Sequence, residues 1–199
     1  DKYVSDEITA LVRSKRFSAE EGEIFPLFIK HVLVLVVGLG DDKKISKTSL
    51  CLAVKQALGS SFVREIESLR LFPHAKDDGT ILNMIEGAKI GSYKWQKYLN
   101  PQKRKKALSL VAIAALAKKI YLDRIKICDG VNYARNLVND NADVIHSLLI
   151  ERELKHIVKE KKNMRLEILG EKELKRKGLN LLLAVNNASQ YPPRLMIAR

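Results

Sequence analysis

The sequence is poor in the residues that would place it in several large protein classes. It has two cysteines in 199 residues, Cys51 and Cys128, and neither belongs to a CxxC pair. A disulfide framework or a zinc cluster is therefore not predicted. Both cysteines lie in helical patterns, where we expect them to be small buried hydrophobic residues in a reducing compartment. A cytoplasmic location follows from this prediction.

Long apolar runs are also missing. No run approaches the ~20 residues that a membrane-spanning helix needs. The first residues, DKYVSDEITALV, have neither the basic region nor the apolar region of a signal peptide. No membrane partner is predicted.

Catalytic motifs are absent as well. The sequence has no HExxH, DxD or CxxC cluster and no serine nucleophile elbow. A two-metal hydrolase needs several carboxylates that converge on ions ~3.5–4 Å apart, whereas acidic residues here are scattered singly over helices. The four histidines are too far apart in sequence to suggest a local site: His31, His74, His146 and His156. We predict no catalytic residue and no metal ligand in this chain.

Positive charge, in contrast, is abundant. Lys and Arg number 36 against 23 Asp and Glu, a formal net charge of +13. Such an excess permits binding to nucleic acid, although it is also typical of a solvated surface. The densest basic run gives the candidate nucleic-acid-binding residues, Lys103, Arg104, Lys105 and Lys106. Aromatic residues make up only 6%, so base stacking is not suggested. DNA is a possible partner, and a nucleic-acid-binding module is the alternative function.

Periodicity predicts an α/β fold for the first half of the chain. The run Val32–Val37 is predicted to be a strand buried on both faces, in the middle of a parallel or mixed sheet. Pro26 places the preceding strand at an edge or at a bulge. Further strands and helices alternate along the chain: strands 24–29, 66–72 and 108–113, and helices 6–16, 46–58 and 81–99. Gly87 and Gly91 in the last of these helices would let a neighbouring backbone approach closely.

The turn Gly38–Asp42 resembles a phosphate-binding loop in part. It follows a strand and contains two glycines, but the third glycine of GxGxxG is absent. Asp41 and Asp42 lie where a phosphate would bind. The pattern favours a tight turn.

A long helix is predicted over 114–140, with an apolar stripe at Ile120, Ile127, Val131, Ala134 and Val138. Two organisations remain open: a linker between two domains, or a long helix within one domain. The first gives an amino-terminal domain over 1–113, a linker helix over 114–140 and a second unit over 141–199.

The second unit again alternates helices and strands. Helices are predicted over 144–159 and 171–177, strands over 166–169 and 194–198, and a buried segment over 181–185. Such a half-built unit would leave sheet edges and apolar faces uncovered. We therefore expect a truncated domain that continues beyond these residues.

Several of these segments, in this order, resemble one family. They are LVLVVGLG at 33–40, EGAKIGSYKWQKY at 86–98, GVNYARNLVN at 130–139 and the segment from Glu173 to PPRL at 192–195. Together they resemble the leucyl aminopeptidases, also called cytosol aminopeptidases, which are two-metal exopeptidases. The sequence departs from the family pattern at Asn141, at Ile145-His146, at Leu179-Asn180 and at 187–189.

The resemblance implies a macro-domain-like amino-terminal mixed sheet with flanking helices, a long linker helix and the start of an α/β catalytic domain. It also implies a parent hydrolase that removes N-terminal residues from peptides with two divalent ions, Mn or Zn. The family's metal ligands and catalytic Lys and Arg lie beyond the PPRL segment. This chain would then serve assembly and access in a homohexamer, together with its own catalytic domain.

Overall fold

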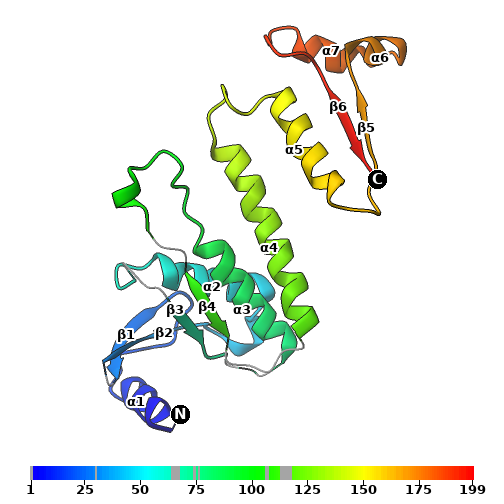
Figure 1. The fold of residues 1–199 in the computed structure, drawn as a ribbon. Coiled ribbons are helices and arrows are strands. Elements are labelled where there is room, and N and C mark those ends of the chain that lie inside the picture. The colour runs from blue at the N-terminus through cyan, green and yellow to red at the C-terminus, as the bar shows by residue number, and fades with distance from the viewer. Residues whose placement is uncertain are drawn as a thin grey trace. The chain divides into compact units, whose positions relative to one another are not determined.

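The computed structural model of the protein describes residues 2–29, 31–63, 68–73, 75, 77–105, 108–112 and 118–199. The chain divides into two compact units, Asp1–Arg135 and Asn136–Arg199. Each unit is mixed α/β (Figure 1). The predicted three-part division with boundaries at 113/114 and 140/141 stays a prediction.

The first unit begins with helix α1 (Lys2–Arg13) and an antiparallel hairpin of β1 (Ile24–Ile29) and β2 (Val32–Val37). Both predicted strands are confirmed. The expected burial of β2 on both faces is wrong: among the described strands β2 pairs only with β1, and none of its residues is fully buried. Phe28 and Val32, at the hairpin's turn end, are 78% and 61% exposed. An apolar run alone therefore did not distinguish a central strand from an exposed hairpin.

The core of the first unit lies between two helices, α2 (Lys47–Gly59) and α3 (Asp78–Gly91), which lie side by side (Figure 1). Ser46 caps α2 in a capping box with Ser49, and the Asp77 carboxylate caps α3 by accepting from the Thr80 N–H at 2.8 Å. The buried apolar side chains of these helices are Leu50, Ala53, Val54, Ile81, Leu82, Ile85 and Ala88.

Helix α3 ends earlier than the sequence predicts. It stops at Gly91, where the Ser92 N–H donates to the Ala88 carbonyl, rather than at Leu99. The residues that follow form a loop with the short 3-10 helix η2 (Pro101–Lys103). Gln96 closes this loop because its side chain bonds both the N–H and the carbonyl of Lys105, at 2.6 and 3.0 Å. Trp95, expected on the helix, lies in the loop.

Two short parallel strands, β3 (Ser68–Leu71) and β4 (Ser109–Ala112), complete the strands of the first unit. A further 3-10 helix, η1 (Asp42–Lys44), follows β2. The described strands thus form two-stranded sheets rather than one continuous sheet. His74, Lys106 and the first residues of the long predicted helix lie outside the described residues.

Helix α4 (Lys118–Asn139) is present, but its predicted stripe is wrong. Ile127 and Val138 are 61% and 82% exposed, while Cys128 is fully buried. The face toward α3 carries Cys128 with polar residues that bond α3, as described below. The apolar stripe lies about a quarter turn away from that face.

The second unit holds α5 (Ser147–Lys159), the antiparallel pair β5 (Leu166–Leu169) and β6 (Leu195–Ala198), α6 (Glu171–Arg176) and α7 (Asn180–Asn186). Gly178, with φ of 68°, follows the end of α6. The prediction of a buried segment over 181–185 is wrong, because Leu181 and Val185 are 81% and 79% exposed. In the part of the chain that is described, no helix is long and apolar enough to cross a membrane.

Candidate functional site

The segment that resembles EGA in the family forms the closest helix contact of the first unit. A Cβ atom on Gly87 would lie 2.7 Å from the Cys51 carbonyl oxygen and 2.9 Å from its Cα. A Cβ on Gly91 would lie 2.9 Å from the Cα of Lys55. Because only glycine permits this approach, the predicted role of both glycines is confirmed.

Glu86, beside that contact, is the centre of a charge cluster. Its carboxylate pairs with the Arg124 guanidinium of α4 and with the Lys47 ammonium of α2 at 3.3 Å. The Glu86 and Arg124 side chains are only 18% and 24% exposed. The Glu86 carboxylate thus links α2, α3 and α4, and the two cations balance its negative charge.

The segment GVNYARNLVN also has a clear structural role. The Asn132 side-chain amide donates to the Lys89 carbonyl at 3.2 Å, and Arg135 donates to the Ile90 carbonyl at 2.9 Å. These carbonyls belong to the last turn of α3. No N–H group of a further helical turn is available to donate to them. The Arg135 guanidinium also lies 3.9 Å from the ring centroid of Tyr93. Helix α4 therefore caps the end of α3.

The predicted burial of the two free cysteines is confirmed for Cys128 only. Cys128 is fully buried, and Cys51 is half-buried with its thiol donating to the Asn83 carbonyl at 3.1 Å. Burial raises the pKa of both thiols, and the nearby Glu86 carboxylate raises each pKa further. Such thiols are poor nucleophiles.

The residues present do not fit a two-metal centre. Among the described residues, no group of three or more His, Cys, Asp or Glu side chains is placed to hold a metal ion. The least exposed carboxylates are already paired with cations. Glu151, for example, accepts from Lys155 and from Arg194, both at 2.6 Å. Hydrogen bonds from Lys155 and Arg194 lower the pKa of this carboxyl.

The described histidines lie apart and have local roles. His31 occupies the turn of the β1–β2 hairpin with φ of 67°. His146 caps α5 through Nδ1, which accepts from the Leu149 N–H at 3.4 Å, and its ring stacks on Tyr191 at 3.9 Å. His156 lies 3.6 Å from Glu160 on an exposed helix face. Among the described residues, none of the three joins a group of His, Cys, Asp or Glu side chains that could hold a metal ion.

The basic run lies in the loop that follows α3. Arg104 is used within this loop, because its guanidinium donates to the Leu99 carbonyl at 3.1 Å and to the Lys97 carbonyl at 3.0 Å. Lys103 and Lys105 are exposed. The structure therefore brings three of the four predicted residues together and gives Arg104 a structural role, while nucleic-acid binding by the run stays a prediction.

The turn after β2 packs against backbone, as expected for a tight turn. The Gly38 N–H donates to the Glu23 carbonyl at 2.8 Å, and a Cβ on Gly38 would lie 2.0 Å from the Glu20 carbonyl oxygen. Asp41 accepts from the Lys43 N–H and caps η1. The space that a phosphate would need is occupied by the chain.

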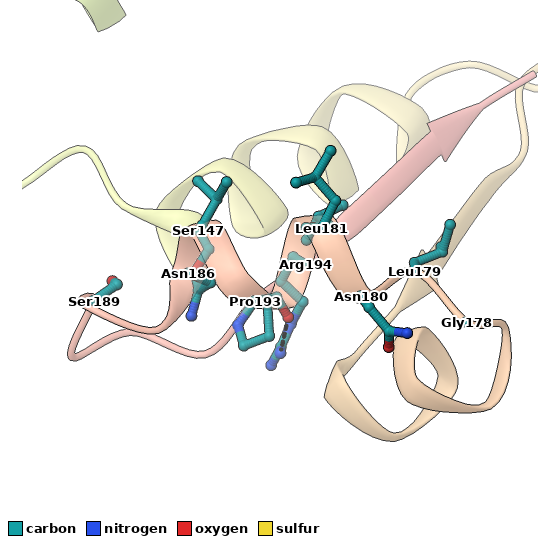
Figure 2. A pocket seen from close by; sticks show the side chains of 11 residues that line it. Ser147, Gly178, Leu179, Asn180, Leu181, Asn186, Ser189, Pro193 and Arg194 are labelled. Atoms are coloured by element: carbon teal, nitrogen blue, oxygen red, sulfur yellow. Dashed lines mark hydrogen bonds between the residues drawn. The ribbon is translucent and has the colours of Figure 1, made fainter.

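The second unit has an open groove of about 630 Å³. Figure 2 shows the side chains around it, from α5, α7, the Gly178 turn and the start of β6. The lining is mostly apolar: Leu179, Leu181, Leu182, Val185 and Pro193, with Ser147, Asn180, Asn186, Ser189 and Arg194.

Sequence reasoning missed the roles of four residues in this region. His146 was noted only as a departure from the family pattern, yet it caps α5. Glu151 and Arg194 form the ion pair that joins α5 to β6, and Ser147 Oγ donates to the Pro192 carbonyl at 2.7 Å. The only sequence signal was the PPRL segment itself, whose partners lie about 45 residues away.

Comparison with known proteins relates these sequence segments to one family. The family model described as "Cytosol aminopeptidase family, catalytic domain" matches residues 132–199. A "Probable cytosol aminopeptidase" of Protochlamydia amoebophila is 28% identical over 203 residues, covering 91% of this chain and 39% of its own length. Another, from Sulfurihydrogenibium sp., is 26% identical and covers 98% and 42%. This chain thus spans about two fifths of these relatives.

Solved structures agree on the fold. A mutant of tomato leucine aminopeptidase superposes with a TM-score of 0.81 at 20% identity, over all of this chain and 42% of that chain. The bottromycin maturation enzyme BotP gives 0.75 at 21% identity, over 94% and 42%. The resemblance seen in the sequence is confirmed: this chain is similar to cytosol aminopeptidases along most of its length, and its residues 132–199 match the model of that family's catalytic domain.

Proposed function

We propose that this chain is the amino-terminal part of a metal-dependent leucyl aminopeptidase, a hydrolase that removes N-terminal residues from peptides. The observation that carries the proposal is the similarity to probable cytosol aminopeptidases along 98% of the chain. The chain would comprise an amino-terminal domain related to the macro domain, a linker helix and the first part of the catalytic domain.

In this proposal the chain has a structural role and contributes no catalytic residue. The contacts of Glu86, Asn132 and Arg135 fix α4 against α3. The metal ions, Mn or Zn, would bind to residues outside this chain, since its half-buried carboxylates are paired with cations.

Assembly and access are the roles left to this part. The resemblance implies a homohexamer whose amino-terminal domains lie on the outside of the assembly. We place this assembly in the cytoplasm. A bottromycin maturation enzyme has been solved in complex with Mn, and we extend metal dependence to the parent of this chain by analogy.

The test is direct. The purified 199-residue chain should release no p-nitroaniline from leucyl p-nitroanilide with Mn²⁺ or Zn²⁺, because it lacks a metal-binding carboxylate cluster among its described residues. The same chain joined to the unmatched part of the Protochlamydia amoebophila relative should release it in a metal-dependent way. Metal-dependent turnover by the 199-residue chain alone, above a no-protein control, would contradict the proposal.

A further inference from the structure

The longest uncharged run of the sequence covers residues 178–193, GLNLLLAVNNASQYPP, in a chain that is 30% charged. This run contains α7 and all the residues that line the groove described above except Ser147 and Arg194. Charged residues are depleted at the cores of protein–protein interfaces, and a strongly basic chain has few other places without charge. The run is therefore a candidate interaction surface.

Helix α7 presents aliphatic side chains to solvent on this surface. Leu181 and Val185 are 81% and 79% exposed and lie one helical turn apart. The neighbouring Leu182 and Leu183 are half-buried, so the helix is apolar on both sides. A helix that is apolar all round is typical of one covered on both faces.

The groove beside α7 does not suit a small polar ligand. Most of its polar side chains bond to neighbouring protein groups: Asn186 donates to the Tyr191 carbonyl at 3.0 Å, and Ser147 donates to the Pro192 carbonyl. Arg194 donates to Glu151 and to the Pro193 carbonyl, the latter at 2.9 Å (Figure 2). The surface that remains is apolar, which fits aliphatic or aromatic side chains of another polypeptide segment.

We propose that Leu181, Val185 and the adjoining groove dock the part of the aminopeptidase catalytic domain that this chain does not contain. The inference rests on the proposed function. The catalytic-domain match includes α7, and this chain spans only 39% and 42% of two relatives, so most of their length lies outside it. An uncharged apolar face is what an internal domain contact requires, whereas a nucleic acid would require the basic faces.

The experiment co-expresses the tagged 199-residue chain with the unmatched part of the Protochlamydia amoebophila relative as a separate, untagged polypeptide. We expect the two to co-purify, and the double variant L181E/V185E to retain at most a tenth of the partner. The control is F28E, an equally exposed apolar position in the first unit, at 78%. It should retain the partner. Circular dichroism must show that both variants are folded.

A second measurement keeps the proposal testable if the separate polypeptide is insoluble. With Leu181→Cys, a maleimide should label residue 181 in the chain alone, and should label it at least tenfold more slowly when the relative's unmatched part follows residue 199. Equal labelling rates, or co-purification unaffected by L181E/V185E, would overturn the proposal. So would a dimer of the chain alone that L181E/V185E converts to a monomer, because the occupant would be a second copy.

The outcomes separate this inference from the proposed function. A complex that forms through α7 but shows no metal-dependent hydrolysis of leucyl p-nitroanilide supports the docking surface and contradicts the proposed function. Hydrolysis by a complex that L181E/V185E leaves intact supports the function and overturns the docking surface.

Discussion

Gly87→Ala tests the helix contact on which the first unit is built. The added Cβ would lie 2.7 and 2.9 Å from the backbone oxygen and Cα of Cys51, and 3.1 Å from the Val54 Cβ. Backbone atoms cannot rotate away, so α2 and α3 must separate. Overpacking of this kind costs ~1–3 kcal/mol, and the backbone contact favours the upper end. Alanine returns ~1 kcal/mol of helix propensity, which leaves a net loss of about 2 kcal/mol.

Gly130→Ala is the matched control. Gly130 lies inside α4, and a Cβ there would meet nothing within 4 Å. Only the propensity gain of ~1 kcal/mol applies, so this variant should be more stable than the wild type. Urea unfolding followed by circular dichroism measures both free energies. If Gly87→Ala stabilises the protein as much as Gly130→Ala does, then α2 and α3 do not pack as closely as described here.

Three further predictions concern other contacts. Arg135→Ala should lower the stability of the first unit by about 2 kcal/mol, because it removes the bond to a helix-terminal carbonyl and the contact with Tyr93; a thermal melt unchanged by the substitution contradicts this role. Glu151→Gln should weaken the dependence of unfolding on acid. The pKa of the Glu151 carboxyl is lower in the folded protein than its unfolded value of 4.5. The stability that this carboxylate contributes is therefore present above pH 4.5 and is lost as the pH falls through the folded-state pKa. Titration of urea midpoints from pH 7 to pH 3 checks it, and identical slopes for variant and wild type count against the ion pair. Duplex DNA, if the basic loop binds it, should dissociate between 50 and 200 mM salt and bind less to Lys103→Glu in a filter-binding assay; absence of binding at 50 mM salt removes the nucleic-acid alternative.

Local signals in the sequence were sufficient for most elements. The helix predicted over 46–58 is observed over Lys47–Gly59 with Ser46 as its N-cap, since a cap depends on the residues next to it. The close approach at Gly87 was also predictable, because glycine on an apolar helix face has few other uses. These features need no knowledge of distant contacts.

Burial was less predictable, because it depends on partners that lie elsewhere in the chain. Helix α4 turns the polar side chains of Asn132 and Arg135 toward α3, whose terminal carbonyls need donors. Its apolar residue Ile127 is left exposed. The hydrophobic pattern of α4 could not predict that this helix would contact α3 through hydrogen-bonding side chains. Similarly, Val32 and Leu181 lie in apolar runs that were predicted to be buried, yet both side chains are exposed.

The candidate site divides in the same way. The resemblance in motif order, which each short segment alone would not support, identified the family and is confirmed by the comparisons. The residues that fix its geometry, His146, Glu151 and Arg194, were not found, because their contacts join positions far apart in sequence. The groove beside α7 could not be predicted at all, since the same residues were expected to be buried.

The most direct test of the central claim is the intact mass of the native protein. An antibody raised against this chain would recover the protein from its source cells for mass spectrometry. The account predicts a mass more than twice the 22.5 kDa of this chain, because the chain spans about two fifths of its relatives. A native protein of 22.5 kDa, recovered without a co-purifying catalytic polypeptide, would contradict the assignment of this chain to an aminopeptidase.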